Sequence, residues 1–268
     1  MSDWSASAAG LGVGFLVGMT GMGGGALMAP VLILLLGVRP LYAVGTDLAY
    51  AAIAKAFGAW QHHRLGHVDY SVVWAMAIGS VPGSLLGVAL LTAAHERLGA
   101  DVDRVVLHLL GIVLILVAAV VLARGILADR SEAPSQPTAP APPGSAASGG
   151  PPPTRRWLLP LAGAVIGLVV GLTSVGSGSL VVAFLGVFTA LTPRRLVGTD
   201  VLHGALLSAV AGLAHAGVGD VDWPLVGQLL IGAVPGVLIG SRLTGILPQR
   251  AVRSAIALVL LVTGVRLL

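Results

Sequence analysis

The sequence predicts an all-α fold: a polytopic integral membrane protein of two four-segment repeats, each opening with a glycine-broken helical hairpin. Three observations predict it: an apolar composition, eight long apolar stretches, and a second half that repeats the first. Hydrophobic residues make up 56% of the 268 residues and charged residues 10%, with a mean hydropathy of +0.96. Because a soluble domain carries about 25% charged residues, this composition indicates a chain that lies in the lipid bilayer.

The composition also excludes several classes of site. The chain has no cysteine, so disulfides, thiolate metal sites and cysteine nucleophiles are ruled out. The net charge of +4 is better explained by loop arginines that set membrane topology than by a nucleic-acid surface. Residues 1–7 lack the basic start of a cleavable signal peptide, so we expect the first apolar segment to be retained. Neither a cofactor nor a nucleic-acid partner is predicted.

A membrane-spanning helix needs about 20 apolar residues. By that measure the apolar segments lie near residues 6–37, 41–61, 70–94, 105–127, 157–190, 195–217, 223–247 and 250–268. The first and fifth are too long for one span, and each contains a glycine cluster. We therefore expect each of them to form two short helices that meet at a break, which is tolerated at membrane depth only inside protein or beside a water-filled cavity.

A stretch rich in proline, alanine, serine and glycine separates the two halves at residues 128–154. It cannot bury a core, so we expect a disordered linker. The predicted organisation is therefore a first membrane repeat at 1–127, the linker, and a second membrane repeat at 155–268.

The two halves align without gaps at a spacing of 153 residues. Residues 14–87 and 167–240 share 27 identities over 74 positions, including the pairs Pro40/Pro193, Asp47/Asp200, His62/His215, Asp69/Asp222 and Pro82/Pro235. Compositional bias raises the identity between apolar helices, but it does not align aspartates, histidines and prolines. We interpret the halves as a duplication.

Loop arginines favour inverted repeats. If each glycine-broken segment is a hairpin that returns to its own side, four arginines lie on one face and ten on the other; if each crosses once, the split is six against eight. Cytoplasmic loops are richer in Lys and Arg, so the hairpin arrangement is favoured, with a cytoplasmic linker and both termini outside. Inverted repeats with broken helices are a recurring plan of secondary transporters, which bind substrate where the repeats meet.

The glycine clusters at 21–25 and 174–178 have two interpretations. They can be simple helix contacts or turns, or they can expose backbone N–H groups at a helix start and bind an anion there. The second copy favours the anion site, because hydroxyl donors replace or flank glycines. The candidate residues of the two clusters are Gly21, Gly23, Gly24 and Gly25 in the first and Thr173, Ser174, Ser177 and Gly178 in the second.

Asp47 and Asp200 are the only two of eleven acidic residues that fall inside apolar segments, and they are repeat mates. Pro40 and Pro193 suit the first turn of their helices, which places each aspartate seven residues in, about 10 Å deep at 1.5 Å per residue. An intramembrane carboxylate is costly and functional by default, so either acid is a candidate carrier of a coupling proton. The alternative is a bond to the backbone of the neighbouring broken hairpin.

Lys55 and His203 are further candidates for a polar core. Lys55, the only lysine, lies about two helical turns after Asp47, so it cannot pair with that acid directly. It could reach an acid of the other repeat or an anionic substrate, but snorkelling toward the loop at 62–64 is slightly favoured. His203 follows Asp200 by three positions, and a hydrogen bond to that acid is favoured over a proton relay.

Three histidines and an aspartate near the end of the second segment resemble a metal cluster. Because the second copy keeps only two of the four, no metal is predicted. The four residues are His62, His63, His67 and Asp69, with His215 and Asp222 as the two counterparts.

The chain also resembles the TauE/SafE sulfite exporters, a family also called the toluene sulfonate uptake permeases. The resemblance rests on the glycine-rich first hairpin ending at Pro30, on Val-Gly-Thr-Asp at 44–47 and 197–200, and on Gly-x-Val-Asp at 66–69 and 219–222. It implies a bacterial inner-membrane carrier of small sulfur-containing anions or carboxylates. Carried over by position, the two hairpins together with Thr46-Asp47 and Thr199-Asp200 would line the substrate path.

The predicted function is a secondary transporter of a sulfur-containing oxyanion, organosulfonate or carboxylate, driven by a proton or sodium gradient. A homo-oligomer is compatible with this function, and no nucleotide-binding motif indicates ATP drive. One alternative is an intramembrane serine protease, with Ser177 as nucleophile and His203 or His215 as base. The repeat argues against it because Ser177 aligns with Gly24. An anion channel or membrane scaffold is the other alternative.

Overall fold

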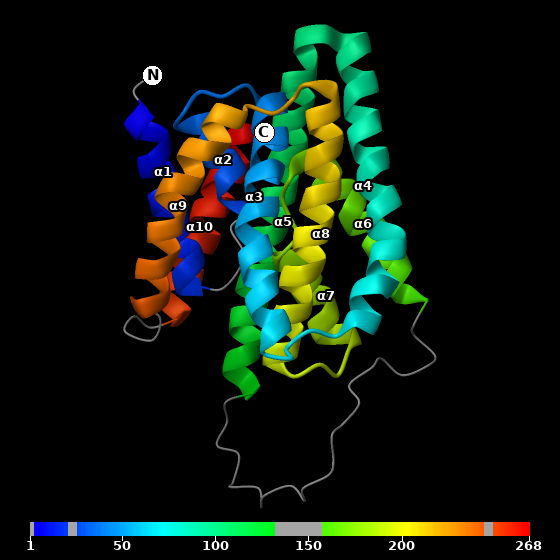
Figure 1. Cartoon of the computed structure of the whole chain (residues 1–268), viewed down its shortest axis with the longest axis vertical. Helices are drawn as coiled ribbons and strands as arrows, with labels where there is room; N and C mark the ends of the chain where they lie inside the picture. The colour runs from blue at the N-terminus through cyan, green and yellow to red at the C-terminus, as the bar shows by residue number, and fades with distance from the viewer. Residues whose placement is uncertain (1–2, 21–25, 132–156, 244–248) are drawn as a thin grey trace, which may run out of the picture.

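The computed structural model describes residues 3–20, 26–131, 157–243 and 249–268, and within these ranges every regular element is helical (Figure 1). The predicted all-α class is therefore confirmed. The helices are α1 (Asp3–Thr20), α2 (Met28–Leu34), α3 (Pro40–Arg64), α4 (Tyr70–Leu98), α5 (Val102–Ser131), α6 (Leu158–Thr173), α7 (Ser179–Phe188), α8 (Pro193–Val218), α9 (Trp223–Leu243) and α10 (Gln249–Leu267), with the short 3-10 helix η2 (Gly99–Asp101) between α4 and α5. Helix α5 continues past residue 128, where the linker was predicted to begin.

The fifth predicted segment is broken into two helices, as expected. Helix α6 ends at Thr173, Ser174 adopts a left-handed conformation with φ 61°, and α7 begins at Ser179. Helix α7 returns to the lower end of the molecule, where α6 begins (Figure 1). In the first segment α1 ends at Thr20 and α2 begins at Met28, and the predicted anion-binding glycines at 21–25 lie outside the described residues.

Helices from the two halves pack in pairs, α1 along α9 and α4 along α6. Glycines allow this close approach, because a Cβ at any of six positions would lie 2.2 to 2.5 Å from a carbonyl oxygen of the partner helix. Those positions are Gly10, Gly14 and Gly18 on α1, facing α9, and Gly163, Gly167 and Gly171 on α6, facing α4. Each glycine contact between α1 and α9 therefore has a counterpart between α6 and α4, in which the glycine lies 153 positions later in the chain.

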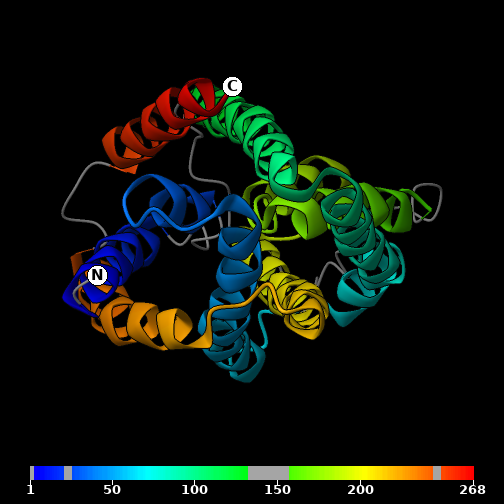
Figure 2. The same ribbon diagram turned by 90° about the horizontal axis from the view of Figure 1, so that it is seen from above.

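Helices α3 and α8 cross at the centre of the molecule, between the α1–α9 pair and the α4–α6 pair (Figure 2). They run in opposite directions, because Gly212 on α8 lies against Leu48 on α3 while Gly58 on α3 lies against Val201 on α8. Helices α5 and α10 cross where Gly111 and Gly264 face each other's carbonyl oxygens.

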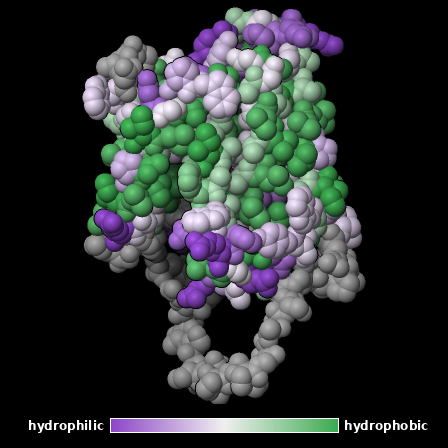
Figure 3. Space-filling view, in the orientation of Figure 1, coloured by the Kyte–Doolittle hydropathy of each residue, from purple (hydrophilic) through white to green (hydrophobic). Residues whose placement is uncertain are grey.

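The outer surface matches a membrane protein. Figure 3 shows hydrophobic side chains over the middle of the visible face and hydrophilic side chains gathered toward its two ends. Three described stretches are long and apolar enough to cross a membrane: Tyr70–Arg124, which contains α4 and most of α5, then Pro193–Val218 and Trp223–Leu243. Helices α1, α6 and α7 supply shorter apolar helices.

Candidate functional site

A buried polar core forms where the break between α6 and α7 meets α3 and α8. It brings together six of the predicted residues, each at most 8% exposed: Asp47, Lys55, Ser174, Ser177, Asp200 and His203. Gly204 provides the room, since a Cβ there would lie 3.1 Å from Lys55 Nζ and 3.3 Å from the carbonyl oxygen of Ser177. Residues far apart in the chain thus share one polar cluster inside an apolar protein.

Asp47 is fully buried and is held by the broken hairpin of the other half. The Ser174 hydroxyl donates to Asp47 Oδ2 at 2.7 Å, whereas Oδ1 has no hydrogen-bond partner among the described residues. Ser174 is also the one non-glycine residue of the described ranges with a positive φ, a conformation that costs of order 1–3 kcal/mol. The carboxylate therefore anchors the strained turn through a side chain, not through the backbone bond considered from the sequence.

Lys55 points into the core, so the snorkelling favoured from the sequence is wrong. Its Nζ donates to the Ser177 hydroxyl at 2.6 Å, and its charge is attracted by both Asp200 and Asp47. No salt bridge within 4.0 Å joins these described groups, so the lysine interacts with both carboxylates at longer range than a direct ion pair. These attractions offset part of the cost of burying the charged form of the lysine.

Asp200 lines a cavity of about 410 Å³ between α5, α7, α8 and α10. Gly178 and Ser179, at the start of α7, line it as well, as do Arg124 and Arg253. Both arginines belong to the ten that were counted above only as loop charges on the linker side. A signal was present, because each lies inside a predicted apolar segment, where an ionisable residue marks a functional position.

The two buried histidines, His203 and His215, form hydrogen bonds outside the polar core. His203 Nε2 hydrogen-bonds with the Ser80 hydroxyl at 2.9 Å, so the predicted bond to Asp200 is wrong. The reason is packing: His203 faces α4, which the sequence did not place beside α8. His215 Nε2 donates to the carbonyl oxygen of Gly171 at 3.1 Å. Neither ring contacts Ser177, whose hydroxyl is bound to Lys55 instead.

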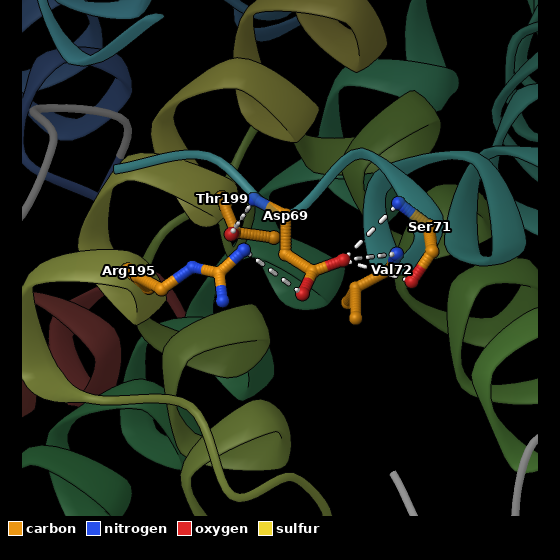
Figure 4. Close-up of polar contacts among 5 residues, drawn as sticks. All are labelled: Asp69, Ser71, Val72, Arg195 and Thr199. Carbon is orange, nitrogen blue, oxygen red and sulfur yellow. Dashed lines mark hydrogen bonds and ion pairs between the residues drawn. The ribbon is translucent and has the colours of Figure 1, made fainter. Parts of the chain in front are cut away.

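The two threonines of the repeated Val-Gly-Thr-Asp motif hold the loops that precede α4 and α9. Thr199 accepts a hydrogen bond from the backbone N–H of Asp69 at 2.9 Å (Figure 4), and Thr46 accepts one from the backbone N–H of Asp222 at 3.1 Å. A Cβ on Gly198 would lie 2.4 Å from the carbonyl oxygen of His67, so glycine lets this loop approach. The hydroxyls predicted to bind substrate thus have structural partners.

Asp69 connects this loop to its own helix and to α8. Its Oδ1 accepts from the backbone N–H groups of Ser71 and Val72, which caps α4, and its Oδ2 lies 3.5 Å from Arg195 Nη2 (Figure 4).

Thr173, another predicted binding residue, also has structural partners: its hydroxyl donates to the carbonyl oxygen of Val169 and accepts from the backbone N–H of Val175. Of the predicted hairpin residues, Gly178 faces the cavity.

The sequence matches the family model described as Sulfite exporter TauE/SafE over residues 6–267. The chain belongs to the TauE/SafE family. It is 40% identical over 263 residues, 97% of each chain, to "Probable membrane transporter protein YjnA" of Bacillus subtilis. It is 27% identical over 257 residues, 96% of each chain, to "Probable membrane transporter protein YdhB" of the same organism. A "Probable membrane transporter protein" of Haemophilus influenzae is 24% identical over 278 residues, 95% of this chain and 93% of its own.

No solved structure gives a significant match to this TauE/SafE protein. The predicted family resemblance is confirmed, and the apolar helices agree with the membrane transporters among its relatives. The names of those relatives specify neither a substrate nor a coupling ion.

Proposed function

We propose that this protein is a secondary transporter that moves a small anion, a sulfur-containing oxyanion, organosulfonate or carboxylate, across the cell inner membrane. The observation that carries the proposal is the burial of Asp47, Lys55 and Asp200 beside the α6–α7 break. Ionisable side chains inside a membrane are expensive and mark substrate and ion pathways. Half-helices that end at such a break are a common way to present helix ends to substrate and coupling ion.

The transporter has two inverted repeats in this proposal. The antiparallel crossing of α3 and α8 supports it, as do the α1–α9 and α4–α6 contacts that recur at a spacing of 153 residues. Substrate sites in this architecture lie at the interface of the repeats near the bilayer midplane. The core around Lys55 occupies the corresponding place, because it joins α3 of one half to the broken hairpin of the other.

The linker end of the molecule faces the cytoplasm in our proposal. Helix α5 ends and α6 begins at the opposite end of the molecule from the start of α1 and the end of α10 (Figure 1), and the arginine count assigns ten arginines to the linker side and four to the other. The excess of positive charge belongs on the cytoplasmic side.

Uptake into proteoliposomes tests the function. The purified protein would be reconstituted and offered sulfite, thiosulfate, toluenesulfonate or acetate under an imposed proton or sodium gradient. We expect saturable accumulation of at least one anion that depends on the gradient. Flux that neither saturates nor accumulates would indicate a channel, and no flux of any of the four would contradict a transporter of this substrate class.

A serine hydrolase is a second candidate because Ser177 and Lys55 form a close pair, an arrangement that some hydrolases use as nucleophile and base. Their burial, at 1% and 8% exposure, argues against access by a peptide and water. Ser177→Ala separates the two functions. A hydrolase would lose all activity, whereas the transporter keeps measurable flux.

A further inference from the structure

The cavity beside Asp200 is lined by two arginines, of which Arg124 is attracted by Asp200 from beyond ion-pair distance. Arg124 on α5 and Arg253 on α10 both line it, and they are close enough for their like charges to repel one another. Neither guanidinium forms an ion pair with any described residue. Among the described residues of the lining, Asp200 is the one with an acidic side chain. Two guanidiniums that face one carboxylate leave an excess of positive charge in the cavity.

The lining of the cavity also carries hydrogen-bond donors. Gly178 is the N-cap of the ten-residue helix α7 and Ser179 is its first residue, and the N-terminus is the positive end of the helix dipole. The Ser179 hydroxyl is buried and has no partner among the described residues. Asp200 itself is 7% exposed, and its Oδ1 is likewise unpartnered. Polar atoms that are buried and unpaired mark places where a water, an ion or a ligand can bind.

We propose that this cavity is a joint binding site for a small oxyanion and a proton, in which Arg124 and Arg253 hold the oxyanion and Asp200 takes up the proton when the anion binds. Guanidinium forks match the oxygens of such anions. While Asp200 is ionised, its charge repels the anion and offsets one arginine; when it is protonated, the repulsion disappears. Each ligand therefore strengthens the binding of the other, and this coupling is reciprocal.

The other charged and titratable groups around Asp200 have partners of their own. Lys55 reaches in from α3, but it is bound to Ser177 and shared with Asp47. His203 lies on α8 with Asp200 and is bound to Ser80. Among the described residues that line the cavity, Ser179 is the one polar side chain from α7. Asp200 is thus the group at the cavity left to exchange a proton.

This inference rests on the proposed transport function, because it assigns the cavity to the substrate path. It adds the site, its guanidinium ligands and the reason why anion and proton move together. It also separates the two repeat-mate acids, since Asp47 is fully buried, does not line the cavity and is bound to Ser174.

Calorimetric titration of the purified full-length protein tests the site. Sulfite, thiosulfate and toluenesulfonate would each be titrated in two buffers of different ionisation enthalpy, which reports proton uptake per bound anion. We expect binding of at least one anion that tightens as pH falls and takes up about one proton. Arg124→Gln and Arg253→Gln should each weaken binding about tenfold or more, because charge-assisted hydrogen bonds are lost. Arg64→Gln, an exposed arginine outside the cavity, is the matched control and should bind like the unmodified protein.

The aspartate variants separate the proton site from a general electrostatic effect. Asp200→Asn should still bind the anion but without proton uptake and without pH dependence, whereas Asp200→Glu and Asp47→Asn should keep both. Proton uptake that survives in Asp200→Asn, unchanged affinity in both arginine variants, or no binding of any of the three anions would overturn the inference. If proteoliposome uptake persists in those cases, the transport function stands and only this site assignment fails.

Discussion

The ammonium of Lys55 donates a hydrogen bond to the hydroxyl of Ser177, 122 positions later in the chain, at 2.6 Å. This bond ties α3 of the first half to the broken hairpin of the second. It also orients the Lys55 side chain, whose charge two buried carboxylates, Asp47 and Asp200, both attract. A change at this single lysine should therefore affect the electrostatic environment of both acids.

Replacing Lys55 should be more damaging than removing its hydrogen-bond partner. Lys55→Met leaves two buried carboxylates without their shared cation, and we expect gradient-driven uptake to fall at least tenfold and stability to fall by about 2 kcal/mol or more. Ser177→Ala removes one hydrogen bond, worth about 1 kcal/mol, and keeps the charge in place. Proteoliposome uptake and thermal unfolding in detergent measure the two effects. Equal losses in the two variants would show that the charge is irrelevant.

Neutralising both buried acids should abolish coupling. In the Asp47→Asn and Asp200→Asn double variant, the side chains keep their size but no longer exchange a proton. We expect normal membrane insertion and no accumulation of substrate against its gradient, measured as uptake driven by an imposed pH difference. Asp101→Asn, in the exposed turn between α4 and α5, serves as the control and should accumulate normally. If the double variant still concentrates substrate, proton coupling through these acids is wrong.

The loop contacts made by the repeated threonines should contribute to stability. Thr199→Val removes the acceptor for the buried backbone N–H of Asp69, and an unpaired buried N–H costs about 1–3 kcal/mol. Thr46→Val should have a similar effect through Asp222. Thr92→Val is the control, because its hydroxyl only donates to the carbonyl oxygen of Val88, within its own helix. Thermal unfolding in detergent should separate the first two variants from the third.

Much of the fold could be predicted because its signals are local. The glycines at 174–178 conflict with a continuous helix, so the break between α6 and α7 was visible in the sequence. Asp47 and Asp200 stand out among apolar neighbours, and both are buried. Composition and segment length are also local properties of the sequence, and they predicted a helical membrane protein.

The partners of the core residues could not be predicted, because they come from the other half of the chain. Nothing near Lys55 in the sequence indicates that Ser177 is its hydrogen-bond partner, so snorkelling was favoured. Its repeat mate, Ser208, is uncharged and does not indicate a buried charge at this position. His203 lies three positions from Asp200, yet it turns to Ser80 on α4. A spacing along one helix shows which residues share a face, but it does not show which helix covers that face.

The glycine contacts between the halves yield the sharpest packing prediction. Between membrane helices, association depends on close van der Waals contact instead of a hydrophobic driving force, so small residues at the interface are decisive. A Cβ on Gly79 would lie 1.8 Å from the carbonyl oxygen of Pro160, and a Cβ on its repeat mate Gly232 would lie 1.8 Å from that of Ser7. We expect Gly79→Ala and Gly232→Ala each to force their helices apart and to destabilise the protein by about 1–3 kcal/mol.

Gly227, on α9, provides the matched control because a Cβ there would meet nothing within 4 Å. Alanine is the better helix former by about 1 kcal/mol, so Gly227→Ala should unfold at the same temperature as the unmodified protein or at a higher one. Thermal unfolding of the three variants in one detergent makes the comparison direct. Gly79→Ala and Gly232→Ala proteins as stable as Gly227→Ala would mean that the α4–α6 and α1–α9 contacts are looser than described. A loss of stability in only one of the Gly79→Ala and Gly232→Ala variants would mean that the two helix pairs do not pack equivalently.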